Sequence, residues 1–362
     1  MRNHIGYPMT CKRFLVFTST FLIALMSILT GGTPFAEAQE GEIQVFQSIA
    51  TNGASDWKFF TIDSDHFLVV ANASNSEGDE VSSVIYRWDG TEFAEFQSIP
   101  GNSSNDWVFF TIGEDHYLGV TNPLDGTTKD INSKIYKWNG SAFIEYQAIP
   151  TVAGSDWEFF TIDSNYYLAV ANFEDDKEEN PDGEDILHRE IDSKIYKWDG
   201  TQFAEFQSIA TAGATDWKYF SIGSNHYLAV ANAVDDADNN NISSEIYKWN
   251  GTSFVSFQAV PTNGGSDWEF FTIDDSHYLA IANFLRSTGG APISVIDSKI
   301  YKWNGTNFSD FQAIPTVGAN DWEYFTIGED HYLTVANHFR LDNAAPVYDI
   351  ASTLYKWNGT GF

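Results

Sequence analysis

The sequence predicts an all-β protein, a single β-propeller of six four-stranded blades. Three observations lead to this fold. An Asp-Trp pair recurs six times, successive pairs are 50 to 60 positions apart, and each pair is followed by four short segments with strand-like patterns. Repeats of this length with four strands each are typical of propeller blades, which stack face to face on their apolar side chains.

The overall composition agrees with a folded, strongly acidic protein. The 362 residues include 50 acidic and 19 basic side chains, which gives a formal net charge of −31. Nucleic acids and anionic lipids would be repelled by this charge, so neither is an expected partner. Aromatic residues make up 16% of the chain, more than a disordered acidic segment would contain. Cys11 is the one cysteine, which excludes a disulfide framework and a cysteine-based zinc site.

Residues 1–38 have the pattern of a secretory signal peptide. Three basic residues precede an apolar run from Phe14 to Leu29, and the small-residue motif Ala36-Glu37-Ala38 follows. The run is shorter than the roughly 20 residues that span a membrane. We therefore expect cleavage after Ala38 and export to the periplasm, the cell surface or the medium. The propeller then occupies residues 39–362, with no membrane span.

The third repeat shows the four expected strands, here named A to D. Strand A is 156–162, beginning at the Asp-Trp pair, and strand B is 166–172, which is apolar without alternation. Such a run is typical of a strand buried on both faces. Strands C (194–198) and D (203–209) alternate between apolar and polar residues. Asn-Gly or Asp-Gly lies between C and D in every repeat, and this pair is the strongest short-range hairpin signal.

The length variation among the repeats lies in one loop. From the Asn that ends strand B to the Ser that opens strand C, the six separations are 11, 11, 21, 12, 15 and 15 positions. In an up-and-down blade, the B–C loops and the D–A connectors emerge on one side, and the A–B and C–D turns emerge on the other. We therefore expect one face of tight turns and one face that carries every variable loop.

The two ends of the repeat series fit together. Residues 43–49 have the strand D pattern and precede the first Asp-Trp pair, while Phe362 follows the last C–D turn. The N-terminal strand is expected to complete the last blade, which would close the ring and remove its edges.

The repeat pattern resembles a known family. It reads D-W-x-[FY]-F-[TS]-I, then [HY]-[FY]-L-x-[VI]-[AT]-N, then I-Y-x-W and F-x-x-[FY]-Q-x-[IV]. This pattern is similar to the epilepsy-associated repeat (EAR), also called EPTP, over residues 42–362. The resemblance implies a secreted β-propeller that binds other proteins. The family usually has seven repeats, so a seven-bladed arrangement is the alternative to six blades.

The repeated residues are interpreted as structural, because every blade must bury its apolar side chains against its neighbours in the same way. An aspartate at the start of strand A commonly accepts hydrogen bonds from backbone amides of its own turn. The repeated glutamine of strand D is expected to bridge strands. The Asp-Trp positions are Asp56, Trp57, Asp106, Trp107, Asp156, Trp157, Asp216, Trp217, Asp267, Trp268, Asp321 and Trp322.

The most individual segments are the acidic B–C loops of the third and fourth repeats. They are the candidate partner-binding face, and the alternative is that they are simply solvated. Oxygen-rich loops also suit calcium, but neither loop follows the EF-hand pattern, so calcium is only a possibility and no cofactor is firmly implied. The candidate residues are Glu174, Asp175, Asp176, Glu178, Glu179, Asp182, Glu184, Asp185, Asp235, Asp236 and Asp238.

The function that these features favour is a secreted, monomeric, non-enzymatic binding module. Its partner would be an extracellular protein bound by the variable-loop face. One alternative is a lectin in which sugars stack on repeated aromatic residues between blades, and another is a glycan-processing enzyme with two unrepeated carboxylates in one cleft. Symmetry separates them, because lectin sites should repeat, whereas a partner face or an active site should lie in unrepeated loops.

Overall fold

A computed structural model of the chain describes residues 45–73, 81–101, 103–124, 128–179, 185–342 and 345–362. Within these ranges every regular element is a β-strand, which confirms the all-β class. The described ranges contain no helix that is long and apolar enough to cross a membrane. The expected signal peptide, residues 1–38, lies outside them.

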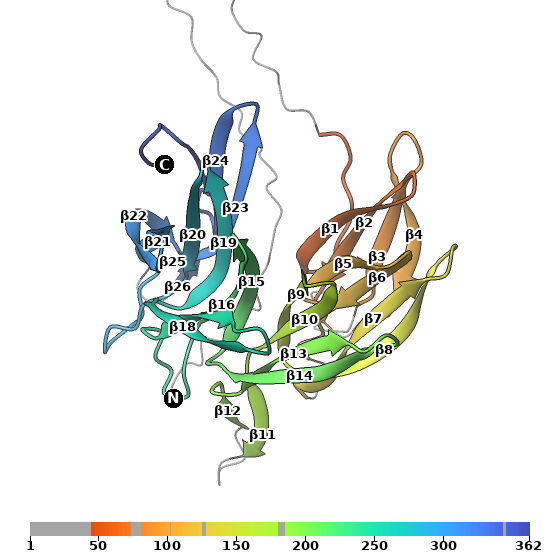
Figure 1. Cartoon of the computed structure of the whole chain (residues 1–362), viewed down its shortest axis with the longest axis horizontal. Coiled ribbons are helices and arrows are strands. Elements are labelled where there is room, and N and C mark those ends of the chain that lie inside the picture. Colours follow the sequence, from red (N-terminus) through yellow and green to blue (C-terminus); the bar gives the residue numbers. More distant parts are fainter. Residues whose placement is uncertain (1–44, 74–80, 102, 125–127, 180–184, 343–344) are drawn as a thin grey trace, which may run out of the picture.

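Each repeat forms one antiparallel sheet, and the six sheets follow one another as the blades of a propeller (Figure 1). Five blades have four strands in the order A-B-C-D, and blade 6 has three. The strands of blades 1 to 3 are β1 (Ala54–Ile62), β2 (Asp65–Asn72), β3 (Ser83–Trp88), β4 (Phe93–Ile99); β5 (Trp107–Ile112), β6 (Asp115–Val120), β7 (Asp130–Trp138), β8 (Phe143–Val152); and β9 (Gly154–Ile162), β10 (Asn165–Asn172), β13 (Asp192–Trp198), β14 (Phe203–Ala210). Those of blades 4 to 6 are β15 (Ala214–Ile222), β16 (Asn225–Asn232), β17 (Ser243–Trp249), β18 (Phe254–Pro261); β19 (Gly265–Ile273), β20 (Ser276–Asn283), β21 (Val295–Trp303), β22 (Phe308–Val317); and β23 (Ala319–Ile327), β24 (Asp330–Asn337), β27 (Thr353–Lys356).

The strand patterns correspond to burial. In β10 the residues from Tyr167 to Ala171 are at most 1% exposed, so strand B is buried on both faces as expected. In β14, Phe203 and Ile209 are buried while Ala204, Glu205 and Ser208 are exposed, so strand D is partly solvated, and a bulge at Phe206 interrupts its alternation. A bulge at the start of β9 leaves Ser155 as an extra residue between Gly154 and Asp156, which pair with Asn172 and Ala171, and it occurs where the D–A connector enters strand A.

The C–D turns are stabilised by the side chain of the residue that precedes the glycine. The Oδ1 atom of Asn139 accepts hydrogen bonds from the backbone N–H groups of Ser141 and Ala142, each at 2.9 Å. Gly140 then has a φ of 95°, which a residue with a side chain rarely adopts. The hairpin predicted from the Asn-Gly and Asp-Gly pairs is confirmed. The same side-chain acceptor occurs at Asp89, Asp199, Asn250, Asn304 and Asn358.

Adjacent blades stack on aromatic rings. Phe160 of blade 3 stacks on Tyr219 of blade 4 with ring centroids 4.6 Å apart. Trp217 is 1% exposed and packs in a cluster with Phe160 and Ile162. Burying rings of this size is worth roughly 2–3 kcal/mol each. The equivalent stacks are Phe60–Phe109, Phe110–Phe159, Phe220–Phe270 and Phe271–Tyr324.

The strand D glutamines join neighbouring blades, which is a longer reach than the strand bridging expected from the sequence. The Gln207 side chain donates to the carbonyl oxygen of Phe254 at 2.7 Å and accepts from its N–H at 2.9 Å. Both backbone groups at the start of the next strand D are therefore satisfied by one side chain. The other pairs are Gln47–Phe93, Gln97–Phe143, Gln147–Phe203, Gln258–Phe308 and Gln312–Phe362.

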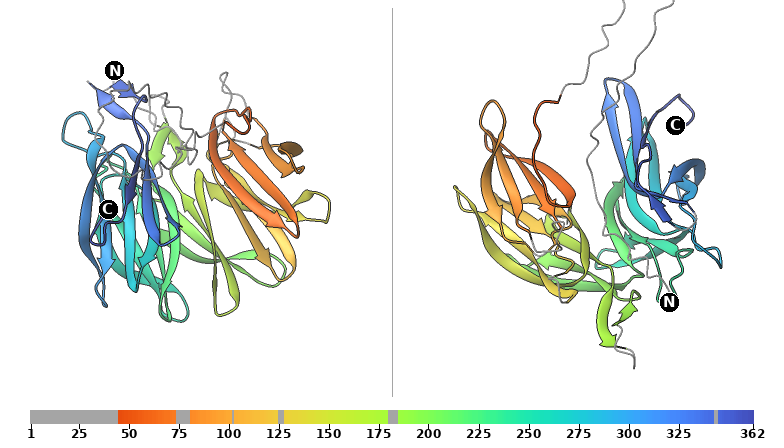
Figure 2. Two further views of the ribbon diagram at one scale, coloured as in Figure 1. Left: turned by 90° about the horizontal axis from the view of Figure 1, so that it is seen from above. Right: turned by 180° about the vertical axis from the view of Figure 1, so that it is seen from behind.

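The ring is open between the first and last blades. Blade 1 stands apart from β23 and β24 of blade 6 (Figures 1 and 2). The expectation that the N-terminal strand completes the last blade is wrong for this structure: β27 is the edge of a three-stranded sheet, and described residues 45–50 form no strand. Gln47 still makes the usual strand D bridge to Phe93, so the segment stays beside blade 1, and the opening between blades 1 and 6 separates it from β27. Consistently, Phe59 and Ile327 are 57% and 63% exposed, whereas most of their counterparts are covered by a neighbouring blade.

Candidate functional site: the variable-loop face

Each variable loop is closed at its base by an asparagine and a serine. In blade 3 the Asn172 side chain donates to the carbonyl of Asp192 at 2.8 Å and accepts from the N–H of Val152 at 3.1 Å. The N–H of Asn172 itself donates to the hydroxyl of Ser193. These bonds tie the end of strand B to the start of strand C and to the D–A connector. The loops and connectors therefore share one side of each blade, as the strand order predicted.

Ion pairs join the loops of blades 2, 3 and 4. The Lys129 ammonium of blade 2 lies 2.5 Å from the Glu174 carboxylate of blade 3, and both side chains are less than 15% exposed. The Arg189 guanidinium contacts Glu174 at 3.2 Å and Asp238 of blade 4 at 2.7 Å. Asp236 of blade 4 accepts hydrogen bonds from the backbone N–H groups of Arg189 and Glu190. Three loops are thus held together around a nearly buried arginine.

Hydrogen bonds extend these connections to blades 5 and 6. Asn241 of blade 4 donates its side-chain N–H to the carbonyl of Ser287 at 2.7 Å, and the Asn240 N–H donates to the Ser287 hydroxyl at 2.9 Å. Between blades 5 and 6, the Leu341 N–H donates to the hydroxyl of Ser294 at 2.9 Å. The loops of blades 2 to 6 therefore form one continuous surface.

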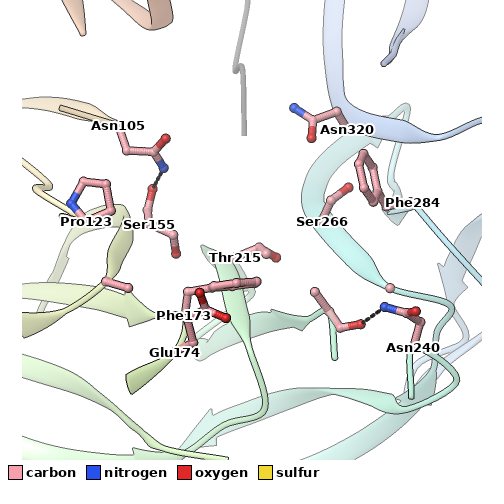
Figure 3. A pocket seen from close by; sticks show the side chains of 13 residues that line it. Asn105, Pro123, Ser155, Phe173, Glu174, Thr215, Asn240, Ser266, Phe284 and Asn320 are labelled. Atoms are coloured by element: carbon pink, nitrogen blue, oxygen red, sulfur yellow. Dashed lines mark hydrogen bonds between the residues drawn. The ribbon is translucent and has the colours of Figure 1, made fainter. Parts of the chain in front are cut away.

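A pocket opens at the centre of this surface. Figure 3 shows Pro123 on one side of it, Phe284 on the other, and Phe173 between them. Most of its polar side chains lie at the start of strand A, and Glu174 and Asn240 come from the loops. Some are already engaged: the Thr215 hydroxyl donates to the carbonyl of Gly265, and Asn105 donates to that of Ser155. The pocket therefore presents mainly apolar walls.

Below the pocket, the A strands of the blades surround a cavity that is lined mostly by acidic side chains. The sequence led us to expect these aspartates to bond within their own turns, and the structure shows that in blades 1 to 5 the carboxylate reaches the next blade. Asp156 accepts a hydrogen bond from the N–H of Trp217 at 2.9 Å. The equivalent bonds run from Trp107 to Asp56, Trp157 to Asp106, Trp268 to Asp216 and Trp322 to Asp267.

The residue after the tryptophan of each Asp-Trp pair varies among the blades, and this variation makes the cavity asymmetric. Glu158 accepts from the N–H of Tyr219 at 2.9 Å, and Glu269 accepts from that of Tyr324 at 3.3 Å. Burial raises the pKa of Glu158 to about 8, although the nearby Lys218 ammonium opposes the change. The position is Lys58 in blade 1 and Val108 in blade 2.

Lys218 forms an ion pair with Glu269 across the interface of blades 4 and 5. Burial alone lowers the pKa of Lys218, but the carboxylates of Glu269, Glu158 and Asp267 outweigh burial, so its pKa is raised. Burial also raises the pKa of Glu269 against the effect of Lys218. These residues were not singled out from the sequence. The only signal was that the third position of D-W-x varies while its neighbours recur.

The structure places the predicted acidic residues in two groups. Glu174, Asp236 and Asp238 serve as internal ion-pair or hydrogen-bond partners, and Asp235 accepts from the N–H groups of Ala237 and Asn239 within its own turn. Asp175, Asp176, Glu178 and Glu179 lie in β11 (Asp175–Glu179), and Asp185 lies in β12 (Asp185–His188). Asp182 and Glu184 lie outside the described residues.

Two short hairpins in the variable loops were not expected from the sequence. They are β11–β12 in blade 3, and β25 (Arg340–Asp342) with β26 (Ala345–Val347) in blade 6. The β11–β12 hairpin projects beyond the ring (Figure 1). Among the described residues, no group of three or more His, Cys, Asp or Glu side chains is arranged to hold a metal ion.

The fold and this face define a class of protein: a repeat-built β-propeller with identical blade contacts and one individual surface. The EPTP domain family model matches six segments of the chain, and the chain belongs to this family. The matched residues are 44–89, 92–139, 142–199, 202–250, 253–304 and 307–358.

Relatives share part of the chain. The human thrombospondin-type laminin G domain and EAR repeat-containing protein is 40% identical over 156 residues, which is 42% of this chain and 23% of that protein. The mouse protein of the same name is 37% identical over 174 residues, 47% of this chain and 25% of that protein. Human leucine-rich repeat LGI family member 2 is 25% identical over 209 residues, 46% of this chain and 36% of that protein. The chain thus matches only about a quarter of the length of the first two relatives.

Among solved structures, the chain is similar in fold to a Bacteroides uniformis structure described as a 6-phosphogluconolactonase. The TM-score is 0.52 at 11% sequence identity, and the alignment covers 82% of this chain and 79% of the other. At this identity the similarity concerns the fold alone.

Proposed function

We propose that the protein is a secreted, non-enzymatic binding module whose variable-loop face takes an extracellular protein partner. The observation that carries this proposal is the set of bonds joining the loops of blades 2 to 6 around one apolar-walled pocket. Loops that are held in place before binding lose less conformational entropy when a partner docks. Export rests on the signal-peptide pattern of residues 1–38.

The pocket indicates how the partner is held. Phe173 and Phe284 are only partly buried, so an apolar side chain inserted between them would remove both rings from water. The acidic loops around the pocket favour basic residues beside that side chain. The lectin alternative has less support, because five of the repeated aromatics that would stack on sugars, among them Phe160 and Phe220, are about 3–4% exposed.

A screen of the secreted protein against an array of extracellular proteins tests the proposal. A partner found there should bind at least tenfold more weakly to Phe173→Ser, whose side chain lines the pocket. Phe59→Ser is the matched control, because Phe59 is a 57% exposed aromatic that does not line the pocket. Equal weakening by both variants would contradict the proposed face. Binding to a glycan array alone would favour the carbohydrate alternative.

A further inference from the structure

Blade 6 is incomplete at its outer edge. Its sheet has the strand order β23-β24-β27, so among the described residues no strand D lies beside β27. In the other five blades strand C pairs on both sides, as β13 pairs with β10 and with β14. The outer side of β27, here called the open edge, therefore presents backbone groups that a neighbouring strand bonds in every other blade.

The direction of the strand shows which backbone groups face the open edge. Trp357, directly after β27, donates its N–H to the carbonyl of His331 beside β24 at 2.9 Å. The backbone groups of successive residues point to opposite edges of a strand, so those of Leu354 and Lys356 point away from β24. These are the groups that a further strand would bond.

Two apolar side chains next to the open edge lack the cover that their counterparts have. Leu354 is 53% exposed, whereas the isoleucine at its position in each other blade is fully buried. Tyr332 of β24 is also partly exposed, while its counterpart Tyr167 is buried. In blade 3, Phe206 of strand D lies 5.4 Å from Tyr167 between ring centroids, and Ile209 of strand D packs in the same cluster. The buried isoleucines are Ile85, Ile135, Ile195, Ile246 and Ile300.

The first position of the missing strand is already in place. Gln312 of blade 5 bonds the backbone N–H and carbonyl of Phe362, and the Phe362 ring lies 5.3 Å from that of Trp357. The phenylalanine that opens strand D of blade 3 has the same set of contacts. What the open edge lacks is the part of strand D that follows this phenylalanine, which is residues 204–209 in blade 3.

The five complete blades define the sequence that suits the open edge. After its first phenylalanine, strand D reads x-x-[FY]-Q-x-[IV] in each of them. The glutamine bridges to the next blade, but Phe93 across the opening is already bonded by Gln47, so blade 6 does not need this residue. The remaining requirement is an aromatic residue that is followed three positions later by an aliphatic one.

The chain's own unpaired segment with this pattern is held elsewhere. Residues 45–49 lie against blade 1, where Gln47 bonds Phe93 and the ring of Phe46 lies 5.8 Å from that of Trp88. Blade 1 stands apart from blade 6 (Figures 1 and 2). A second copy could offer this segment only together with its own blade 1. An extended segment of another protein has neither restriction.

We propose that the open edge of β27 binds an extended segment of an extracellular partner by strand addition. The segment has an aromatic residue that covers Tyr332 and, three positions later, an aliphatic residue that covers Leu354. Main-chain hydrogen bonds to β27 supply affinity, and the two side chains supply specificity. No residue of β27 lines the central pocket, so this site is separate from that of the proposed function and does not depend on it.

The experiment uses the secreted protein and a fluorescein-labelled Ala-Glu-Phe-Gln-Ser-Ile-Ala peptide, the sequence of residues 204–210, with binding followed by anisotropy. The wild type is expected to bind. Leu354→Lys should weaken binding at least about tenfold, because the aliphatic residue would then bury a charge. Ile327→Lys is the matched control and should change affinity less than about twofold. Ile327 is 63% exposed on the same face of blade 6, but it lies in β23, two strands away from β27.

Two methylated peptides test strand pairing itself. In blade 3 the Thr211 N–H donates to the carbonyl of Ile191, so the backbone groups of Ile209 face strand C and those of Ser208 face away. N-methylation of the isoleucine amide in the peptide should therefore weaken binding at least about tenfold, while N-methylation of the serine amide should weaken it less than about threefold.

Several results would overturn the proposal. They are failure of the wild type to bind, equal weakening by the two lysine variants, and equal effects of the two methyl groups. Binding that appears only in Phe46→Ser/Gln47→Ser would also overturn it, because the chain's own N-terminal segment would then fill the open edge. The same holds for a wild-type dimer that Leu354→Lys abolishes, because a second copy would then fill it.

Discussion

The bridges between blades make a quantitative prediction at Gln207. Gln207→Leu keeps a side chain of similar size but removes two hydrogen bonds, of 2.7 and 2.9 Å, to the backbone of Phe254. Each net bond contributes about 0.5–1.5 kcal/mol, and a buried group left unpaired costs about 1–3 kcal/mol. Because the site is only part-buried, water recovers some of this, and we expect a loss of about 2–3 kcal/mol in the free energy of unfolding.

The protein contains its own control for this experiment. Gln47 makes the same two bonds to Phe93, but it holds a terminal segment in which Val45 and Phe46 are each 71% exposed. Releasing that segment exposes little new apolar surface and returns conformational entropy to it. Gln47→Leu should therefore lower the free energy of unfolding by less than about 1 kcal/mol.

Urea unfolding followed by tryptophan fluorescence measures both variants, since all six repeats contain two tryptophans. The midpoint and slope should be compared with the wild type, because a changed slope would signal that the blades no longer unfold together. A loss below about 0.5 kcal/mol for Gln207→Leu, or equal losses for the two variants, would refute the reasoning, since the bonds would then not contribute as their part-buried setting predicts.

Three further predictions concern the cavity, the loop face and one connector. Burial raises the pKa of Glu158 to about 8 from 4.5, so the folded state holds this proton more tightly than the unfolded state does. The stability that the proton contributes is present below pH 4.5 and is lost as the pH rises through 8. Calorimetry from pH 5 to 9 should therefore show a smaller fall in melting temperature for Glu158→Gln than for the wild type. Arg189→Met should speed hydrogen exchange in residues 235–241 while β15 and β16 stay protected, because Asp238 loses its partner; unchanged exchange in that loop would contradict the ion-pair argument. Gly318→Ala should lose at least about 1 kcal/mol more stability than Gly328→Ala in urea unfolding. Both glycines have positive φ, but a Cβ at 318 would lie 2.5 Å from the Phe339 carbonyl oxygen while none lies within 4 Å at 328; equal losses would mean that the connector relaxes freely.

The blades could be predicted from the sequence because every element appears six times. Strand B, the Asp-Trp pair and the Asn-Gly turns recur at fixed offsets, and a pattern that recurs must serve a need common to all blades. The sequence did not show which edge the N-terminal segment would join. Its Gln47 makes the bridge to Phe93 that any strand D makes to the following blade, but pairing with β27 also requires the ring to close, and no residue of the segment specifies that.

The loop face could be located but not resolved in detail. Loop length marked it, yet the pairing of Lys129 with Glu174 and of Arg189 with Asp238 joins residues 45 and 49 positions apart in unrepeated segments. No periodicity specifies such pairs, and many acidic residues compete for few basic ones. The result is that part of the acidic surface expected to meet a partner instead holds the loops together.

Where a ligand can bind follows from what the repeated groups already do. The repeated aspartate of strand A accepts from a tryptophan of the next blade, the repeated glutamine bonds a phenylalanine, and the repeated phenylalanine is stacked. A ligand at such a position would have to break contacts that hold the ring, at a cost of a few kcal/mol for each pair. Only positions that differ among blades remain available without that cost, and in this chain they gather in the variable loops and after the tryptophans in the central cavity. The symmetry of the scaffold thus directs recognition to its asymmetric parts.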